Sequence, residues 1–101
     1  MLLKHIKYKI NMINSLDDIF IDNLPKLDLH GETRDSSRVL VKEFINDNYI
    51  LKNNKIIIIH GIGKSIIKEE VYKILKTENK VISFHLNHYN SGCTMVYLKK
   101  N

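Results

Sequence analysis

Two apolar runs, each ending in His-Gly and giving way to a helical pattern, constrain the fold of this chain more than any other feature. Residues 27–31 read Leu-Asp-Leu-His-Gly, and residues 56–61 read Ile-Ile-Ile-Ile-His-Gly. An apolar run that stops at a glycine and passes into amphipathic periodicity predicts a strand, a turn and a helix. Two such units in succession predict neighbouring parallel strands, because the crossover between them is right-handed.

The two His-Gly turns are therefore expected at the same edge of the sheet, at the carboxyl ends of its strands. Open α/β sheets bind their ligands at that edge. The N-termini of the helices beside it present free N–H groups, which favour anions. The sequence thus predicts a site for a phosphate group.

The rest of the pattern completes the order βαβαββ. Thr33 and Ser65 each precede an apolar stripe at helical spacing and can cap the helix that follows. Two further strands, at residues 81–86 and 94–98, are joined by a short connection, which favours an antiparallel pair. We expect an α/β fold of the α+β type, a two-layer sandwich with a mixed four-stranded sheet and two helices.

The length of 101 residues accommodates one domain. We expect that domain to occupy residues 26–101. Residues 1–25 differ in composition and are expected to form an N-terminal arm, partly ordered or packed on the domain through Ile19, Phe20 and Ile21. The alternative is a basic arm that contacts nucleic acid or a partner protein.

Charge and composition narrow the partners. Lysine and arginine outnumber acidic residues by 16 to 11, which gives a net charge of +5. A basic chain attracts polyanions, nucleic acid first. No apolar run reaches the ~18 residues of a membrane span, and lysines interrupt residues 1–7 before a signal-peptide core forms. The single Cys93 suits a reducing compartment. We expect a cytoplasmic protein without a membrane partner.

Three segments together resemble the Smr (small MutS-related) domain: residues 27–31, residues 60–63 (His-Gly-Ile-Gly) and residues 92–98 (Gly-Cys-Thr-Met-Val-Tyr-Leu). The resemblance covers residues 26–99. It implies a two-layer βαβαββ fold and binding to DNA or RNA. It also implies endonuclease activity, which several members of the family possess, some of them on messenger RNA at stalled ribosomes.

Asp28 and His30 are the candidate catalytic residues. They are two positions apart on the first strand, so their side chains leave the same face. Phosphodiester cleavage needs a proton acceptor and a proton donor, and histidine can be either; a nearby carboxylate can orient the imidazole or activate a water. The resemblance implies a role in cleavage for both positions. In the alternative, His30 only closes the turn and Asp28 only accepts helix N–H groups.

The candidate phosphate-binding residues come from the turns and from the first turns of the helices: Gly31, Arg34, His60, Gly61, Gly63, Lys64 and Lys68. Glycines allow backbone N–H groups to face an anion, and the basic side chains add charge. The alternative is a tight turn flanked by solvated cations. Ser65 stands where the second loop of the family has a further glycine, and residues 89–92 contain one glycine where many members have several, which reduces backbone freedom.

No metal ligands are predicted, because none of the five histidines has zinc-site spacing to the one cysteine. We expect no required cofactor, although Asp28 and a substrate phosphate can together hold Mg²⁺ through water. The first hypothesis is a stand-alone Smr endonuclease that acts on RNA rather than DNA. The second is a non-catalytic module that binds nucleic acid or the ribosome, and the third is a protein-interaction domain.

Overall fold

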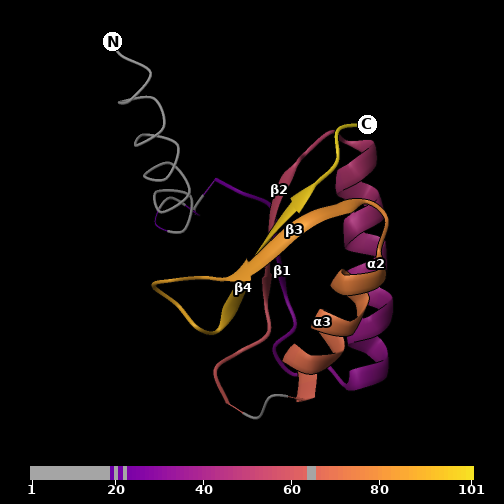
Figure 1. Ribbon diagram of the computed structural model, residues 1–101. Helices are drawn as coiled ribbons and strands as arrows, with labels where there is room; N and C mark the ends of the chain where they lie inside the picture. The colour runs from indigo at the N-terminus through magenta and orange to yellow at the C-terminus, as the bar shows by residue number, and fades with distance from the viewer. Residues whose placement is uncertain (1–18, 20, 22, 64–65) are drawn as a thin grey trace.

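A computed structural model describes residues 19, 21, 23–63 and 66–101, and these form two layers, a four-stranded sheet with two helices on one of its faces (Figure 1). The predicted order βαβαββ is confirmed: β1 (Lys26–Asp28), α2 (Arg34–Ile50), β2 (Lys55–Ile59), α3 (Ile66–Thr77), β3 (Val81–Leu86) and β4 (Cys93–Leu98). The predicted cap Ser65, the predicted ligand Lys64 and most of the N-terminal arm lie outside the described residues.

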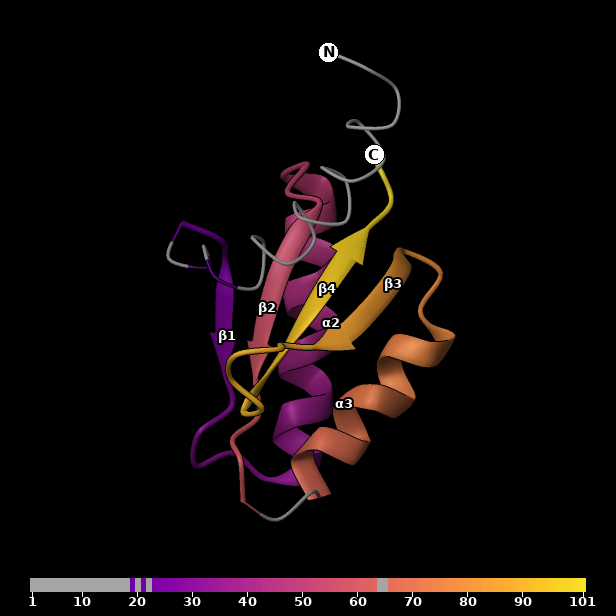
Figure 2. The same ribbon diagram turned by 60° about the vertical axis from the view of Figure 1, so that its left-hand side comes forward.

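The sheet has the strand order β1-β2-β4-β3. β1 runs parallel to β2, with Asp28 opposite Ile59, as the two His-Gly units predict. β4 lies between β2 and β3 and is antiparallel to both, so the predicted pairing of the last two strands is confirmed. The carboxyl ends of β1 and β2 and the starts of both helices meet at one end of the molecule, at the bottom of Figure 2.

Helix α2 begins as the sequence predicts. The Thr33 side chain accepts a hydrogen bond from the Ser36 N–H at 3.1 Å, and the Ser36 hydroxyl accepts one from the Thr33 N–H at 2.9 Å. This reciprocal capping box satisfies two N–H groups that the helix geometry leaves without partners. It fixes the start of the helix beside the first His-Gly turn.

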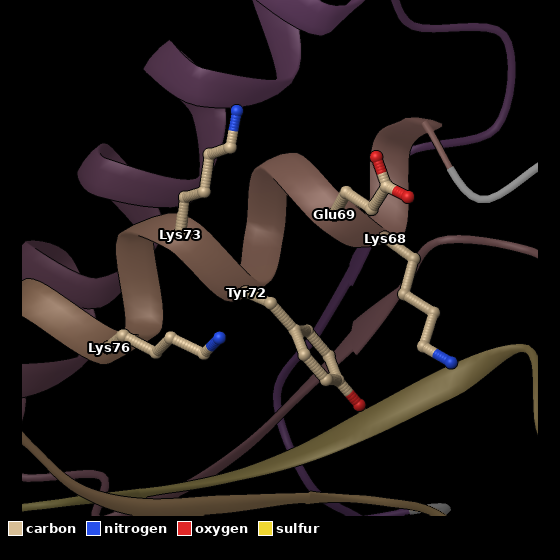
Figure 3. Close-up of a pocket in the computed structure, with 5 residues that line it drawn as sticks. All are labelled: Lys68, Glu69, Tyr72, Lys73 and Lys76. Atoms are coloured by element: carbon tan, nitrogen blue, oxygen red, sulfur yellow. The ribbon is translucent and has the colours of Figure 1, made fainter.

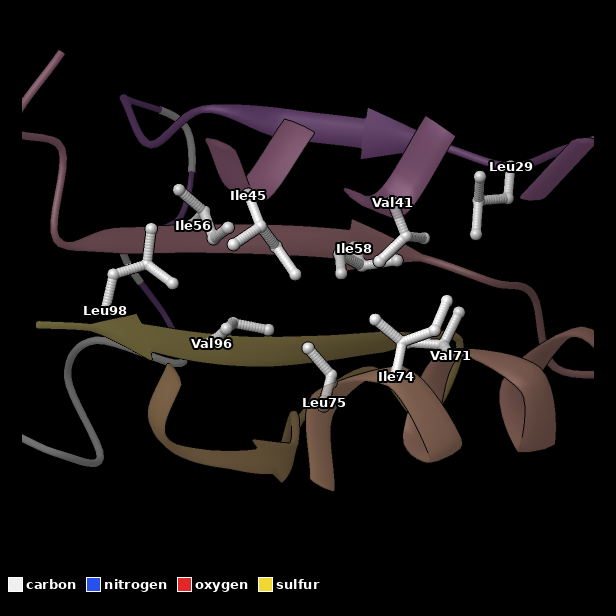
Figure 4. Packing of buried hydrophobic residues seen from close by; sticks show 10 residues of the cluster. All are labelled: Leu29, Val41, Ile45, Ile56, Ile58, Val71, Ile74, Leu75, Val96 and Leu98. Carbon is white, nitrogen blue, oxygen red and sulfur yellow. The ribbon is translucent and has the colours of Figure 1, made fainter. Parts of the chain in front are cut away.

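The main core lies between the helices and the sheet (Figure 4). Alternation along β2 places Ile56 and Ile58 on this side and Ile57 on the other. The cluster consists of apolar side chains from α2, β2, α3 and β4, together with one residue directly after β1: Leu29, Val41, Ile45, Ile56, Ile58, Val71, Ile74, Leu75, Val96 and Leu98. Among the described residues, neither helix has the length and apolar character that crossing a membrane would require.

The second face of the sheet is also covered in part. Ile57, Cys93 and Met95 are buried there, and Ile21 and Leu24, from the segment before β1, pack against them. This segment is joined to the sheet by its backbone as well, because the carbonyl oxygen before β1 accepts the Ile57 N–H at 2.9 Å. Of the three residues expected to pack on the domain, Ile21 contacts this face, Ile19 is 46% exposed, and Phe20 lies outside the described residues.

Candidate functional site

The two His-Gly turns share one hollow of about 320 Å³. They meet because β1 pairs with β2 up to Asp28 and Ile59, and the Leu29 N–H extends this pairing by donating to the Ile59 carbonyl oxygen at 2.9 Å. The lining residues come from both turns and from the start of α3: Asp28, Leu29, His30, Gly31, Glu32, Ile59, His60, Gly61 and Ile67. The predicted meeting of both turns at one sheet edge is therefore observed.

His30 lies at the tip of a tight turn. The Glu32 N–H donates to the Leu29 carbonyl oxygen at 3.0 Å, and Gly31 has a φ of 77°, a conformation that favours glycine at this position of a turn. Asp28 Oδ1 accepts the His30 backbone N–H at 2.9 Å. The His30 side chain is exposed, and its ring makes no hydrogen bond within the described part of the chain.

Asp28 therefore differs from its expected role. Its carboxylate holds the main chain of His30 instead of orienting the imidazole, and the N–H group that it accepts belongs to the turn, not to a helix. Asp28 is exposed at the mouth of the hollow. Its contact with the backbone sets the position from which the His30 ring projects.

His60 has both ring nitrogens occupied. Nδ1 lies 3.0 Å from the Gly61 carbonyl oxygen, which can only accept, so Nδ1 carries the hydrogen. Nε2, 2.8 Å from Thr94 Oγ1, then accepts the threonine hydroxyl. Burial lowers the pKa of His60; the hydrogen bond to Gly61 opposes this effect, and the charge of Lys68 adds to it. The neutral ring joins its loop to β4.

Gly92 anchors the second turn. Its carbonyl oxygen accepts the N–H groups of both His60 and Gly61, each at 2.9 Å. The Gly61 N–H thus faces this carbonyl and does not face an anion, contrary to the expectation for that glycine. A Cβ added at Gly92 would lie 3.1 Å from Ile62 Cγ1 and from Asn90 Oδ1. The one glycine of this loop therefore stands where a side chain has little space.

Arg34 lies in the first turn of α2, as predicted, but it does not line the hollow. Its Nε is 3.8 Å from Glu70 Oε1, while its side chain remains 58% exposed. Arg38 makes the closer contacts, with Nε 3.3 Å from Glu70 Oε2 and Nη2 3.4 Å from Oε1. The Arg38 hydrogen bond lowers the pKa of Glu70, and the charges of Arg38, Lys73 and Arg34 add to this effect against the opposing influence of burial. Glu70 thus connects α3 to α2.

Lys68 and Gly63 are two further residues of the predicted phosphate site. Lys68 extends from the first turns of α3, with its ammonium nitrogen 5.5 Å from the centre of the Tyr72 ring. Gly63 is exposed in the loop that follows the second His-Gly turn. Among the described residues, no group of three or more His, Cys, Asp or Glu side chains is arranged to hold a metal ion. Asp28 and Glu32 are the carboxylates that border the hollow.

The contacts that Thr94 makes with His60 and Glu70 makes with Arg38 were not predicted from the sequence. Thr94 is a buried strand residue 34 positions from His60, and Glu70 is 32 positions from Arg38. No local spacing links either pair, because strand pairing and helix packing bring them together. Glu70 directly follows Lys68 and Glu69, so the local sequence does not distinguish it from an exposed carboxylate, and only the structure shows that it is buried.

Fold and site together define the class of protein, a small two-layer α+β domain with paired His-Gly turns around a polar hollow. The sequence model of the Smr domain matches residues 27–99, and the chain therefore belongs to the Smr domain family. It is 35% identical over 68 residues to endonuclease MutS2 of Caldanaerobacter subterraneus, covering 67% of this chain and 9% of that protein. It is 33% identical over 97 residues to endonuclease MutS2 of Streptococcus uberis, covering 91% of this chain and 12% of that protein.

Two solved structures share the fold. The Smr domain of Thermus thermophilus MutS2 superposes with a TM-score of 0.73 at 22% identity, over 75% of this chain and 99% of that one. YdaL, a stand-alone small MutS-related protein from Escherichia coli, superposes with a TM-score of 0.71 at 24% identity, over 85% of this chain and 75% of that one. At these identities the likeness shows the fold alone. The chain spans about a tenth of the MutS2 proteins that it matches.

Proposed function

We propose that this Smr domain binds nucleic acid at the hollow between its His-Gly turns and cleaves a phosphodiester bond there, with RNA preferred over DNA. One observation carries the proposal: the exposed His30 ring stands at a hollow shared by both turns, beside the start of α2. The name of the MutS2 relatives, endonuclease, supports cleavage as the reaction. The basic net charge of +5 supports a polyanionic substrate.

His30 is the proposed acid-base group. An imidazole can accept the proton of an attacking oxygen or return one to the leaving oxygen near neutral pH. His60 is unsuited to this task, because both of its nitrogens are held by Gly61 and Thr94. Asp28 is a positioning residue, since its carboxylate fixes the His30 backbone at 2.9 Å.

The phosphate is held by groups around the hollow. The proposed donors are the Gly31 backbone and the exposed side chains of Arg34 and Lys68, with Gly63 and Lys64 of the second loop close by in sequence. His60 and Gly61 support this loop through Gly92 and Thr94. The capping box consumes only part of the N–H groups at the start of α2, and the helix dipole there favours an anion.

RNA is the proposed substrate because it carries its own nucleophile. The 2′-oxygen of the ribose attacks phosphorus while its proton leaves, the bond from phosphorus to the 5′-oxygen breaks, and that oxygen gains a proton. His30 handles one of these two proton transfers and water the other. No metal is required for such a step, although Asp28 can hold Mg²⁺ through water. We place the protein in the reducing cytoplasm, which the use of a single cysteine, Cys93, supports.

Paired incubations with labelled single-stranded RNA and matched DNA, with and without EDTA, test the proposal. We expect products from RNA in both conditions. His30→Ala should lower the cleavage rate at least about 100-fold, the usual contribution of an acid-base group, with binding retained, while His88→Ala, in the β3–β4 loop, should cleave normally. Absence of products from both nucleic acids with the unmodified protein would contradict it.

The same assay tests Asp28. Asp28→Ala should slow cleavage because the turn loses an acceptor, whereas Asp28→Asn should restore most of the rate, since its amide oxygen can accept the same N–H group. If the asparagine variant is as slow as the alanine variant, the carboxylate charge itself is needed and the positioning role is wrong.

A binding module without turnover is the second candidate. The observation in its favour is that Asp28 is engaged with the backbone and leaves His30 without a carboxylate partner among the described residues. Salt-dependent binding of RNA, DNA or ribosomes without products, unchanged in His30→Ala, would support this candidate. Affinity that does not respond to salt would instead favour a protein-interaction domain, because phosphate contacts release counterions.

A further inference from the structure

We propose that the outer surface of α3 formed by Lys68, Tyr72, Lys73 and Lys76, here called the α3 basic face, binds the phosphodiester backbone of the nucleic acid strand on one side of the scissile bond. These residues border a second hollow, of about 380 Å³, together with Glu69 (Figure 3). The inference rests on the proposed function. It adds the path that the strand follows away from the scissile bond, and it names contact residues outside the hollow of the His-Gly turns.

Spacing along the helix aligns the relevant groups. Lys68, Tyr72 and Lys76 are four residues apart, so they fall on one side of α3. Figure 3 shows the ammonium groups of Lys68 and Lys76 on the same side of the helix as the Tyr72 hydroxyl, whereas Lys73 extends toward α2. Eight residues of helix span about 12 Å. This length exceeds the distance between successive phosphates of a strand, so Lys68 and Lys76 can contact different phosphates.

Direct contacts connect the α3 basic face to the His-Gly turns. The Lys68 ammonium lies 5.5 Å from the centre of the Tyr72 ring, and the Tyr72 ring meets the His60 ring edge to face with centres 6.5 Å apart. Phe84 of β3 holds the other side of Tyr72, with ring centres 5.2 Å apart. A strand that places one phosphate at the hollow therefore reaches Lys68 next and Lys76 after it.

The chemistry of the α3 basic face fits a backbone and not a base sequence. Three ammonium groups and one carboxylate border the hollow, and lysine binds phosphate as a point charge. Because the Tyr72 ring already packs against Lys68, Phe84 and His60, its hydroxyl is the group left to donate to a phosphate oxygen. Contacts of this kind fix the position of a strand without reading its bases.

Charge reversal at the far end of the α3 basic face tests the inference. Lys76→Glu is compared with Lys52→Glu, a matched change beyond the end of α2, which starts beside the hollow and is about 25 Å long. Binding of labelled 20-nucleotide and 4-nucleotide single strands, as RNA and as DNA, is measured at several salt concentrations. Both lysines are exposed, so circular dichroism should show a fold unchanged by either substitution.

We expect Lys76→Glu to weaken binding of the 20-nucleotide strands about tenfold, and to reduce the slope of log affinity against log salt concentration by about one. Its binding of the 4-nucleotide strands should be unchanged, and Lys52→Glu should bind all strands like the unmodified protein. Tyr72→Phe, which keeps the ring contacts, should weaken long-strand binding about threefold. Equal losses in Lys76→Glu and Lys52→Glu, or a loss confined to RNA or to DNA, would overturn the inference. Failure of the unmodified protein to bind any strand would instead overturn the proposed function.

Discussion

His30 and His60 hold the same position in two copies of one motif, but their surroundings differ. His30 is exposed, and its ring has no hydrogen-bond partner among the described residues, whereas His60 is half-buried between Gly61 and Thr94. The motif alone predicts that both lie at one sheet edge. It cannot assign their tasks, because the difference arises from β4, which reaches His60 only through strand pairing.

The protonation of His60 gives a prediction for stability. Burial lowers its pKa in the folded protein below the ordinary value of 6.5, so below pH 6.5 the unfolded chain takes up the proton first. The contribution of His60 to stability is therefore complete above pH 6.5 and declines as the pH falls below it. We expect the urea midpoint to drop between pH 7.5 and pH 5.5.

The His60→Gln variant isolates this effect, because glutamine stays neutral over the whole range. Its urea midpoint should fall less between the two pH values than that of the unmodified protein. An equal fall in both proteins would show that His60 does not contribute to the pH dependence.

The strands and helices follow closely from local sequence. β3 has the predicted bounds, and β4 begins at Cys93, one residue before the expected start. β1 ends at Asp28 and not at His30, because the Asp28 carboxylate takes the His30 N–H and Gly31 turns the chain with a positive φ. The apolar pattern of the sequence does not predict either the hydrogen bond from the His30 N–H to Asp28 or the residue at which the strand ends.

The connection between α2 and α3 was not predictable from either helix alone. The Arg38 hydrogen bond lowers the pKa of the buried Glu70 below its ordinary value of 4.5. Its contribution to stability is therefore present above pH 4.5 and declines as the pH falls further. We expect Glu70→Gln to lower the urea midpoint at pH 7, and to reduce the loss of stability that acid causes below pH 4.5.

Glu43→Gln is the matched control, since Glu43 is an exposed residue of α2. Its midpoint should match that of the unmodified protein within error. If Glu70→Gln behaves like this control in urea titrations, the contact with Arg38 and Arg34 does not stabilise the pair of helices.

At the scale of the whole molecule, both faces of the sheet carry packed side chains, although helices cover only one of them. Ile21 and Leu24 cover Ile57, Cys93 and Met95 on the second face. The apolar character of β2 predicts burial on both faces, but composition does not reveal which segment supplies the cover. A segment that precedes the matched residues 27–99 therefore contributes to the packing of the domain.

The reactivity of the single cysteine, Cys93, measures how well this face of the sheet is covered. Cys93 is 1% exposed and forms no disulfide. Leu24→Ala should remove part of the apolar cover, lower the free energy of unfolding by about 1 kcal/mol, and accelerate the reaction of Cys93 with a thiol reagent under native conditions. Leu51→Ala, at a side chain that is 68% exposed, should leave the labelling rate unchanged. Equal labelling rates in the two variants would refute the role of Leu24 as cover.

The turn that carries His30 is closed by main-chain groups, by Gly31 and by Asp28, and the imidazole supports none of these bonds. This one position can therefore be exchanged while the scaffold around it stays in place. A library of side chains at residue 30 would compare different proton donors, acceptors and metal-binding groups on a constant frame, so that differences in chemistry would not be confused with differences in folding.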